Sequence, residues 1–295
     1  MATVVISVGG SNHRFIAIAC INIVVAANAG GVFSPFGDIT TLMVWQKEII
    51  SFTGFFALVV PAVVNWLVTA VILSFAVPSV HPEPLESRAR LKHGAWVVVG
   101  LFLLTISMAV TGHNLLHLPP VAGMMTGLGF LKLFGYYLQR RDERHAYIAK
   151  TMLMSTALSI DSGSSEESMP IRPTYDIYRN LKRAEWDSLM FFYGIIMCVG
   201  GLGTFGYLAV GSEMLYGGLG PTTANIMVGV ASAIVDNIPV MFAVLEMYPD
   251  MSQGQWLLAT LTAGVGGSML SIGSAAGVAV MGQARGIYTF FAHFK

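Results

Sequence analysis

Two aspartates stand inside apolar stretches of the chain, where a charged side chain needs a specific reason to be present. Asp38 follows the turn-forming sequence Ser34-Pro35-Phe36-Gly37, and Asp236 is followed by Asn237-Ile238-Pro239. A carboxylate at membrane depth is costly unless it takes up a proton or faces a cation. Competition between a proton and a sodium ion for one carboxylate would exchange the two ions without any further coupling device. The two aspartates therefore point to ion exchange.

Side-chain oxygens, which a hard cation such as sodium prefers, lie close to both aspartates in the sequence. The candidate residues for cation and proton binding are Asp38, Asp236, Asn28, Asn237, Thr40, Thr41, Ser232, Ser271 and Ser274. We expect the sodium ion at Asp236, Asn237, Asn28 and Asp38. The hydroxyls have an alternative, because Ser and Thr in membrane helices often bond only to the backbone or to a neighbouring helix.

Asp187 is a separate case, because it lies at the start of an apolar stretch beside Trp186. An interfacial helix cap is the default interpretation of an aspartate in that position. The alternative is a role in proton entry or in the response to pH.

The composition places these residues in a membrane. Of 295 residues, 55% are hydrophobic and only 11% are charged, whereas soluble domains carry about 25% charged residues. The 16 basic and 16 acidic side chains cancel, so the chain lacks the basic surface that a nucleic-acid-binding protein needs. The sequence predicts an all-α integral membrane protein in a lipid bilayer, with no enzymatic activity and no cofactor.

The charges are concentrated in two polar segments, which set the orientation. Residues 140–187 hold half of the charged side chains, and residues 79–93 hold five more. Two spans separate these segments, so both lie on one side, and the excess of Lys and Arg in such loops marks the cytoplasmic side. Residues 140–187 are interpreted as a polar cytoplasmic linker between residues 1–139 and residues 188–295.

The apolar stretches between these loops are long enough to cross a bilayer, and three of them contain breaks. Plain spanning helices are expected at 49–78, 94–112, 119–139 and 188–210, and broken segments at 13–46, 221–247 and 255–284. The loop 248–254 has no basic residue. A re-entrant hairpin over 221–247 keeps that loop outside and returns Arg285 to the cytoplasm, so we favour the hairpin over a span.

An internal repeat links two of the broken segments. When Gly30-Gly31 is placed on Gly266-Gly267, Gly37 falls on Gly273, and we call this superposition the repeat register. The two segments run in opposite directions in the predicted topology, which is typical of inverted-repeat secondary transporters with broken helices. The same register moves Asp236 to a position before Met1, so the counterpart of the hairpin is missing and the chain is expected to be truncated at its N terminus.

Several motifs resemble those of the NhaD-type sodium/proton antiporters of the ion transporter superfamily. They include Ala26-Ala27-Asn28-Ala29-Gly30-Gly31, Ser34-Pro35-Phe36-Gly37-Asp38, Ala184-Glu185-Trp186-Asp187, Cys198-Val199-Gly200-Gly201 and Val235-Asp236-Asn237-Ile238-Pro239. The resemblance implies exchange of sodium or lithium for protons across the bacterial inner membrane. A homodimer is compatible with it.

Three alternatives stay open from the sequence alone. The superfamily includes dicarboxylate carriers, although two carboxylates would repel an anionic substrate. An intramembrane aspartyl protease would also need two aspartates, but Phe36-Gly37-Asp38 lacks the first glycine of a Gly-x-Gly-Asp motif. The third alternative is a fragment without function.

Overall fold

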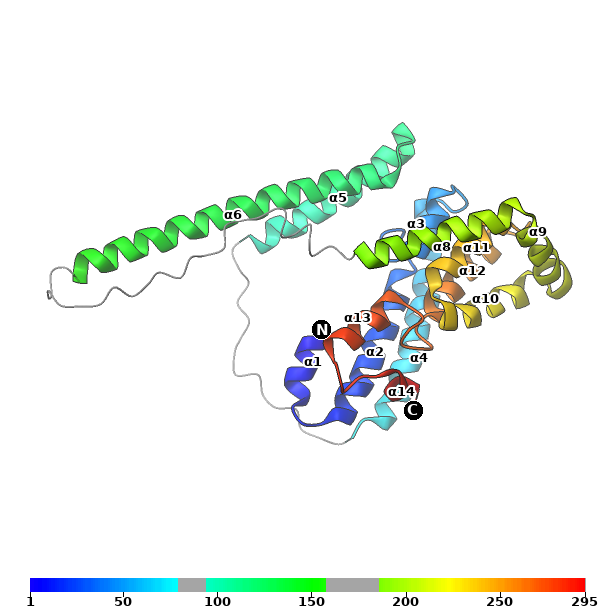
Figure 1. Cartoon of the computed structure of the whole chain (residues 1–295), viewed down its shortest axis with the longest axis horizontal. Helices are drawn as coiled ribbons and strands as arrows, with labels where there is room; N and C mark the ends of the chain where they lie inside the picture. Colours follow the sequence, from blue (N-terminus) through cyan, green and yellow to red (C-terminus); the bar gives the residue numbers. More distant parts are fainter. Residues whose placement is uncertain (79–93, 158–185, 295) are drawn as a thin grey trace. The chain divides into compact units, whose positions relative to one another are not determined.

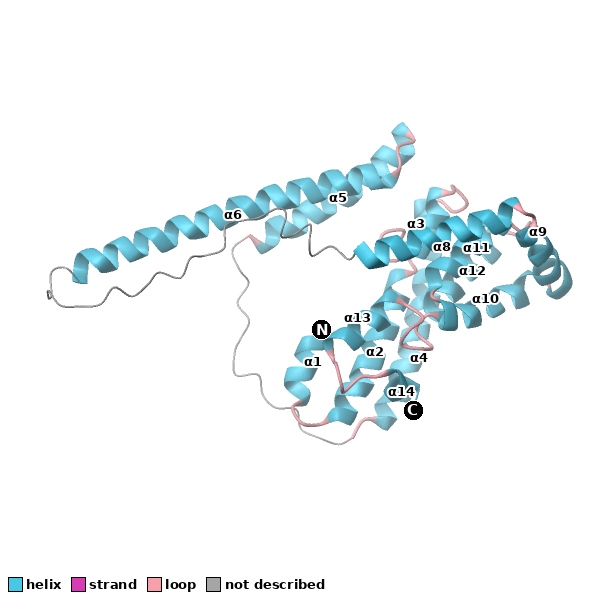
Figure 2. Cartoon of the chain, viewed as in Figure 1, coloured by secondary structure: helices cyan, strands magenta, loops and turns pink. Residues whose placement is uncertain are grey.

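The computed structural model describes residues 1–78, 94–157 and 186–294 and divides the chain into two compact units. One unit comprises Met1–Arg88 and Asp187–Lys295, and the other comprises Ala89–Trp186. The described residues form helices joined by turns and contain no strand, as Figure 2 shows. The chain is therefore an all-α membrane protein, as the composition predicts.

The smaller unit is a pair of contacting helices, α5 (Ala95–Leu116) and α6 (Pro120–Ala157). Glycines let the two backbones approach, because a Cβ on Gly123 would lie 2.5 Å from the Cα of Ala109. The expected spans at 94–112 and 119–139 are present, but α6 does not stop at residue 139. The first part of the expected linker is therefore helical as far as Ala157, since its charged residues are good helix formers. The rest of the linker up to residue 185 lies outside the described residues.

The larger unit carries the broken helices (Figure 1). Its elements are α1 (Ala2–Gly9), α2 (His13–Gly31), α3 (Ile39–Gln46), η1 (Phe52–Leu58), α4 (Val59–Ala76), α8 (Trp186–Thr204), α9 (Tyr207–Ser212), η2 (Glu213–Gly217), α10 (Pro221–Val235), α11 (Asn237–Met247), α12 (Gln253–Gly266), α13 (Ala275–Gln283) and α14 (Phe290–Phe294). The three predicted breaks are present, between α2 and α3, between α10 and α11, and between α12 and α13.

Four helices of the described chain are long and apolar enough to span a membrane: His13–Gly31, Phe52–Ala76, Ala95–Leu116 and Pro120–Arg141. A fifth span arises if the bent pair Leu189–Thr204 and Tyr207–Gly217 is counted as one. The expectation of a plain helix over 188–210 is wrong, because the chain turns by 84° between these two helices. Gly206 permits the turn with a φ of 82°, which costs glycine little.

Helices that the repeat register equates also make equivalent contacts in the structure. It places α2 on α12, α3 on α13 and α1 on α11. Accordingly, α3 packs against α11 and α12, while α13 packs against α1 and α2. Asp38 and Ser274, which the register equates, both adopt extended backbone angles immediately before a half-helix. The two broken segments therefore share one local structure, as expected for an internal repeat.

Glycines make this local structure compact in both halves. A Cβ on Gly37 would lie 2.3 Å from the carbonyl oxygen of Gly31, and a Cβ on Gly267 would lie 2.3 Å from that of Gly273. Each loop thus closes on itself by backbone contact, which only glycine allows at that distance. The glycine spacing that indicated the repeat has a steric cause.

Candidate functional site

Three half-helices of the larger unit begin at residues that the sequence selects as candidate ligands. Asp38 precedes α3, Asp236 precedes α11 and Ser274 precedes α13. The amino end of a helix carries unpaired N–H groups and a partial positive charge, which favours an adjacent carboxylate. The breaks therefore place oxygen-bearing side chains at polar helix ends within otherwise apolar segments.

Asn237 connects the two aspartates. Its side-chain Nδ2 donates a hydrogen bond to Asp38 Oδ2 at 3.2 Å, and its backbone N–H donates to Asp236 Oδ1 at 2.8 Å. Both carboxylates therefore contact the same asparagine. Two residues from distant parts of the sequence thus contribute to one anionic site, in which a proton or a cation would reduce the negative charge.

Asp236 has a backbone conformation that is rare for any residue other than glycine. Its φ is 91° and its ψ is 144°, a combination that costs an L-amino acid on the order of 1–3 kcal/mol. The strained residue separates α10 from α11 and carries one of the two carboxylates. Strain of this kind persists where the surrounding structure enforces it, and it is concentrated at functional sites.

Two further hydrogen bonds connect the candidate residues across the repeat and within its second half. Asn28 of α2 donates from Nδ2 to Ser274 Oγ at 2.9 Å, so it joins the first broken helix to the second. Ser232 Oγ donates to the carbonyl oxygen of Ala263 at 2.6 Å and thereby ties α10 to α12. Asn28, Ser232, Asn237 and Ser274 are all buried.

The remaining candidate hydroxyls, those of Thr40, Thr41 and Ser271, differ in their hydrogen bonds. Thr41 Oγ1 donates to the carbonyl oxygens of Asp38 at 2.7 Å and Ser34 at 2.9 Å, so it supports the first loop. Thr40 and Ser271 are both fully buried. The Thr40 hydroxyl lies beside the Asp38 carboxylate, whereas the Ser271 hydroxyl has no hydrogen-bond partner within the described part of the chain. An unpaired buried hydroxyl is destabilising, and binding to a cation would satisfy it.

Asp187 belongs to the first turn of α8, but its side chain lies outside the described residues. Its expected role as a cap or in proton entry therefore stays a prediction.

Sequence reasoning missed Gly264 as part of the site. A Cβ on this residue would lie 2.4 Å from Val32 Cγ1, 3.3 Å from Asp38 Oδ2 and 3.6 Å from Thr40 Oγ1. The signal that could have found it is the repeat register, which equates Gly264 with Asn28. The repeat therefore has an amide side chain at one of the two equivalent positions and none at the other, where Val32 and the first aspartate pack against the helix backbone.

Sequence reasoning also missed a salt bridge at the far ends of α3 and α11. Lys47 Nζ lies 3.3 Å from Glu246 Oε1, and it joins the two half-helices whose first turns hold Asp38 and Asp236. Both side chains are partly exposed, at 51% for Lys47 and 30% for Glu246. A pair this accessible contributes about 0–1 kcal/mol.

We expect Lys47→Glu to slow ion exchange by about two- to fivefold, because an exposed pair contributes up to about 1 kcal/mol. Exchanging both charges, in Lys47→Glu with Glu246→Lys, should restore the rate. Proton flux in vesicles measures each variant, and Asp250→Lys, at a nearby exposed acid, serves as the control. An additive loss in the double variant would show that the pair does not hold α3 against α11.

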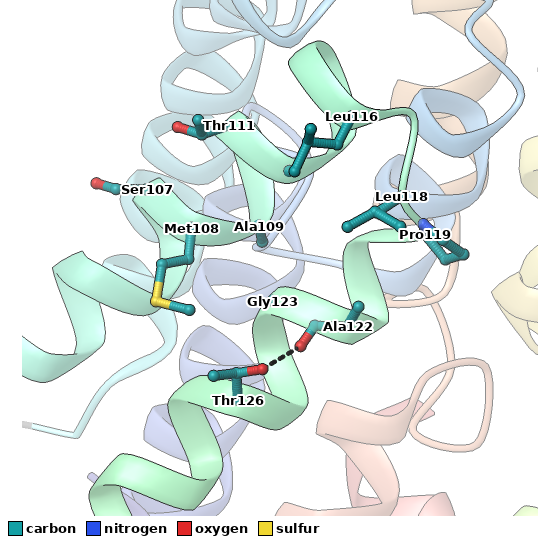
Figure 3. A pocket seen from close by; sticks show the side chains of 11 residues that line it. Ser107, Met108, Ala109, Thr111, Leu116, Leu118, Pro119, Ala122, Gly123 and Thr126 are labelled. Carbon is teal, nitrogen blue, oxygen red and sulfur yellow. Dashed lines mark hydrogen bonds between the residues drawn. The ribbon is translucent and has the colours of Figure 1, made fainter.

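Two of the cavities in the described part of the chain illustrate that the larger hollows lie apart from these ligands. One of about 480 Å³ lies among α2, α4, α10 and α12 in the larger unit, and its lining includes Asn65, Thr69 and Ser268. The other, of about 420 Å³, lies between α5 and α6 in the smaller unit. Figure 3 shows that mainly apolar side chains and the hydroxyls of Ser107, Thr111 and Thr126 surround it. Neither carboxylate lines either cavity.

The described residues contain no group of three or more His, Cys, Asp or Glu side chains that could hold a metal ion. Such a cluster suits a transition metal, whereas a hard cation takes mixed oxygen ligands.

Comparisons with known proteins identify the family. The family model described as citrate transporter, CitMHS, matches residues 1–264. No solved structure matches the chain. The Na(+)/H(+) antiporter NhaD of Vibrio parahaemolyticus is 55% identical over the whole chain, which covers 70% of that protein.

Other relatives extend this result. The Na(+)/H(+) antiporter NhaD of Alkalimonas amylolytica is 54% identical over the whole chain, which spans only 60% of its length. Sodium/proton antiporter 1 of Arabidopsis thaliana is 31% identical over 92% of the chain and 44% of that protein. The chain therefore belongs to the CitMHS family of membrane transporters, which are not enzymes, and to its NhaD-type relatives.

Proposed function

We propose that the protein exchanges Na⁺ or Li⁺ for H⁺ across the membrane, with the carboxylates of Asp38 and Asp236 binding the cation and the proton in turn. The observation that carries this proposal is the bridge by Asn237, which contacts both carboxylates. The names of the NhaD relatives supply the ions.

The geometry suggests how one site could serve both ions. With both carboxylates deprotonated, the two negative charges that Asn237 joins favour a bound cation, and the buried hydroxyl of Ser271 is available as a neutral ligand. With a proton bound, the negative charge of the site falls and sodium loses one of its charged ligands. Because the two bound states exclude each other, net movement of one ion drives the other in the opposite direction.

The family description raises one other candidate substrate, a citrate-like anion. The site argues against it, because an anion would have to approach two carboxylates, which repel negative charge when they are deprotonated. We expect no citrate uptake by vesicles that show sodium-driven proton movement.

The same proposal includes the arrangement in the membrane. We place the protein in the bacterial inner membrane with loops 79–93 and 140–187 in the cytoplasm, because these loops hold most of the basic residues. Residues 221–247 would then enter and leave on one side as a re-entrant hairpin, with Asp236 at its tip. A homodimer and a role for Asp187 in proton entry are further parts of this proposal.

Proton flux in everted membrane vesicles tests the proposed activity. Addition of Na⁺ or Li⁺ to energised vesicles should collapse the pH gradient, whereas K⁺ should not. Vesicles without the protein provide the baseline. Absence of any sodium- or lithium-dependent proton movement from a protein shown to be folded in the membrane would disprove the assignment.

The dependence on pH follows from competition for the carboxylates. Because protons and sodium bind the same groups, lowering the pH should raise the Na⁺ concentration for half-maximal exchange, by up to about tenfold per pH unit for one proton displaced. The maximal rate at saturating Na⁺ should change less. Sodium titrations of the flux at several pH values measure this shift, and a half-saturating concentration independent of pH would argue against a shared site.

A further inference from the structure

His293 contacts the second broken segment, although it lies outside the site described above. It belongs to α14, and its Nε2 is 3.1 Å from the carbonyl oxygen of Ser268. Ser268 is the second residue of the loop 267–274, which joins α12 to α13 and contains Ser271 and Ser274. The imidazole therefore bonds directly to the backbone of the loop that carries two candidate ligands.

The other face of the imidazole is anchored to the protein core. Its Nδ1 lies 2.5 Å from the hydroxyl of Tyr288. Tyr288 is 1% exposed and packs in a buried cluster with Cys20, Val280 and Ala284. These neighbours come from α2, from α13 and from the residue after α13, so the tyrosine hydroxyl occupies a fixed position from which the imidazole can hold the loop.

The partners define the protonation state of the ring. Ser268 offers a carbonyl oxygen, so Nε2 must carry a hydrogen, and the tyrosine hydroxyl then donates to Nδ1. Burial lowers the pKa of the His293 imidazole below its ordinary value, which agrees with a neutral ring. Both nitrogens of this neutral tautomer are therefore satisfied.

The hydrogen bond from His293 fixes one end of the loop, and the hydrogen bond from Asn28 fixes the other. Ser268 is held by His293, and Ser274 accepts a hydrogen bond from Asn28. Ser271 lies midway between these two anchors and has a buried hydroxyl without a partner within the described residues. Anchoring at both ends limits the positions that this hydroxyl can take.

The first loop, between α2 and α3, is also held by the segment that follows its half-helix, but the interaction is different. The repeat register equates residues 288–294 with η1, and Tyr288 with Phe52. The Phe52 ring packs at 6.3 Å from Phe36, which belongs to the first loop, and at 6.0 Å from Trp45. Each loop is thus supported by the segment that follows its half-helix, by aromatic contact in the first repeat and by hydrogen bonds in the second.

We propose that His293 is a positioning residue for the ion site, which holds the loop 267–274 through the Ser268 carbonyl so that Ser271 can bind the transported cation. The proposal rests on the proposed exchange of Na⁺ for H⁺. It assigns no direct contact with the ion to His293 itself.

Two substitutions at one position separate hydrogen bonding from ring packing. His293→Phe keeps a flat ring but loses both bonds, whereas His293→Gln keeps a donor for Ser268 and an acceptor for Tyr288. We expect His293→Phe to raise the half-saturating Na⁺ concentration by about three- to tenfold, the effect of losing the one hydrogen bond that holds the Ser268 carbonyl, with a smaller change in maximal rate. His293→Gln should restore most of the affinity. Tyr288→Phe, which loses only the Nδ1 partner, should have an intermediate effect.

A second measurement does not depend on transport. Amide hydrogen exchange of the purified protein should be faster over residues 267–274 in His293→Phe than in wild type, and near wild type in His293→Gln. If wild type shows no exchange of ions but the amide protection follows this order, the proposed function fails while the anchoring stands. Equal sodium affinity and equal loop protection in all four proteins would overturn the inference. An equal loss of sodium affinity in His293→Phe and His293→Gln would also overturn the inference.

Discussion

Asp236→Asn should reduce sodium-driven proton flux by at least about a hundredfold, which corresponds to roughly 2.7 kcal/mol. The substitution removes the negative charge that a cation needs and the group that a proton needs. It keeps the side-chain size and an oxygen that can accept from the backbone N–H of Asn237, a bond of 2.8 Å in this structure. The strained turn at position 236 should therefore survive, and the loss should come from chemistry and not from unfolding.

Flux in everted vesicles gives the result, after the amount of protein in the membrane has been matched to wild type. Asp38→Asn should have an effect of the same order, because its carboxylate shares the Asn237 bridge. Asp250→Asn is the matched control, since this aspartate is exposed and is not among the candidate ligands. If the Asp236 variant retained wild-type flux, that residue would have no place in the site.

The sequence was sufficient for the local features of this fold. Glycine pairs and the residues Asp38 and Asp236 marked the three breaks, because a carboxylate within an apolar segment is rare unless the helix is interrupted or the group is functional. The repeat register also predicted which half-helices are equivalent, and the contacts of α3 and α13 follow it. Local patterns carry this information since they report the conformation of a few neighbouring residues.

Features that depend on distant parts of the chain were not predictable. The bond between Asn237 and Asp38 joins residues 199 positions apart, and the salt bridge of Lys47 with Glu246 spans the same separation. No pattern within one helix specifies such a pairing. The turn of 84° after Thr204 was missed for a different reason, because Gly206 stands in an apolar run that hydropathy alone describes as continuous.

The second large effect is expected from Gly266→Ala, a change of one methyl group where α10 crosses α12. A Cβ at position 266 would lie 2.1 Å from the carbonyl oxygen of Gly229 and 2.8 Å from its carbonyl carbon. The atoms in conflict are backbone, so the clash cannot be relieved by a side-chain rotation, and the two helices must move apart. Overpacking of this kind costs about 1–3 kcal/mol and occasionally more.

The consequence for transport follows from the position of the contact. Separation of α10 from α12 would stretch the bond from Ser232 to the Ala263 carbonyl, now 2.6 Å, and would displace Asp236, which directly follows α10. We expect both a lower midpoint of thermal unfolding in detergent and a loss of most sodium-driven flux. Gly254→Ala, in the first turn of the same helix, is the control, because a Cβ there meets only Ser252 Oγ at 3.9 Å. Alanine is favoured over glycine in a helix by about 1 kcal/mol, so the control should be as stable as wild type or more so. Equal stability and flux in the two variants would mean that the α10–α12 crossing tolerates a side chain, and that the close glycine contact does not hold Asp236 in place.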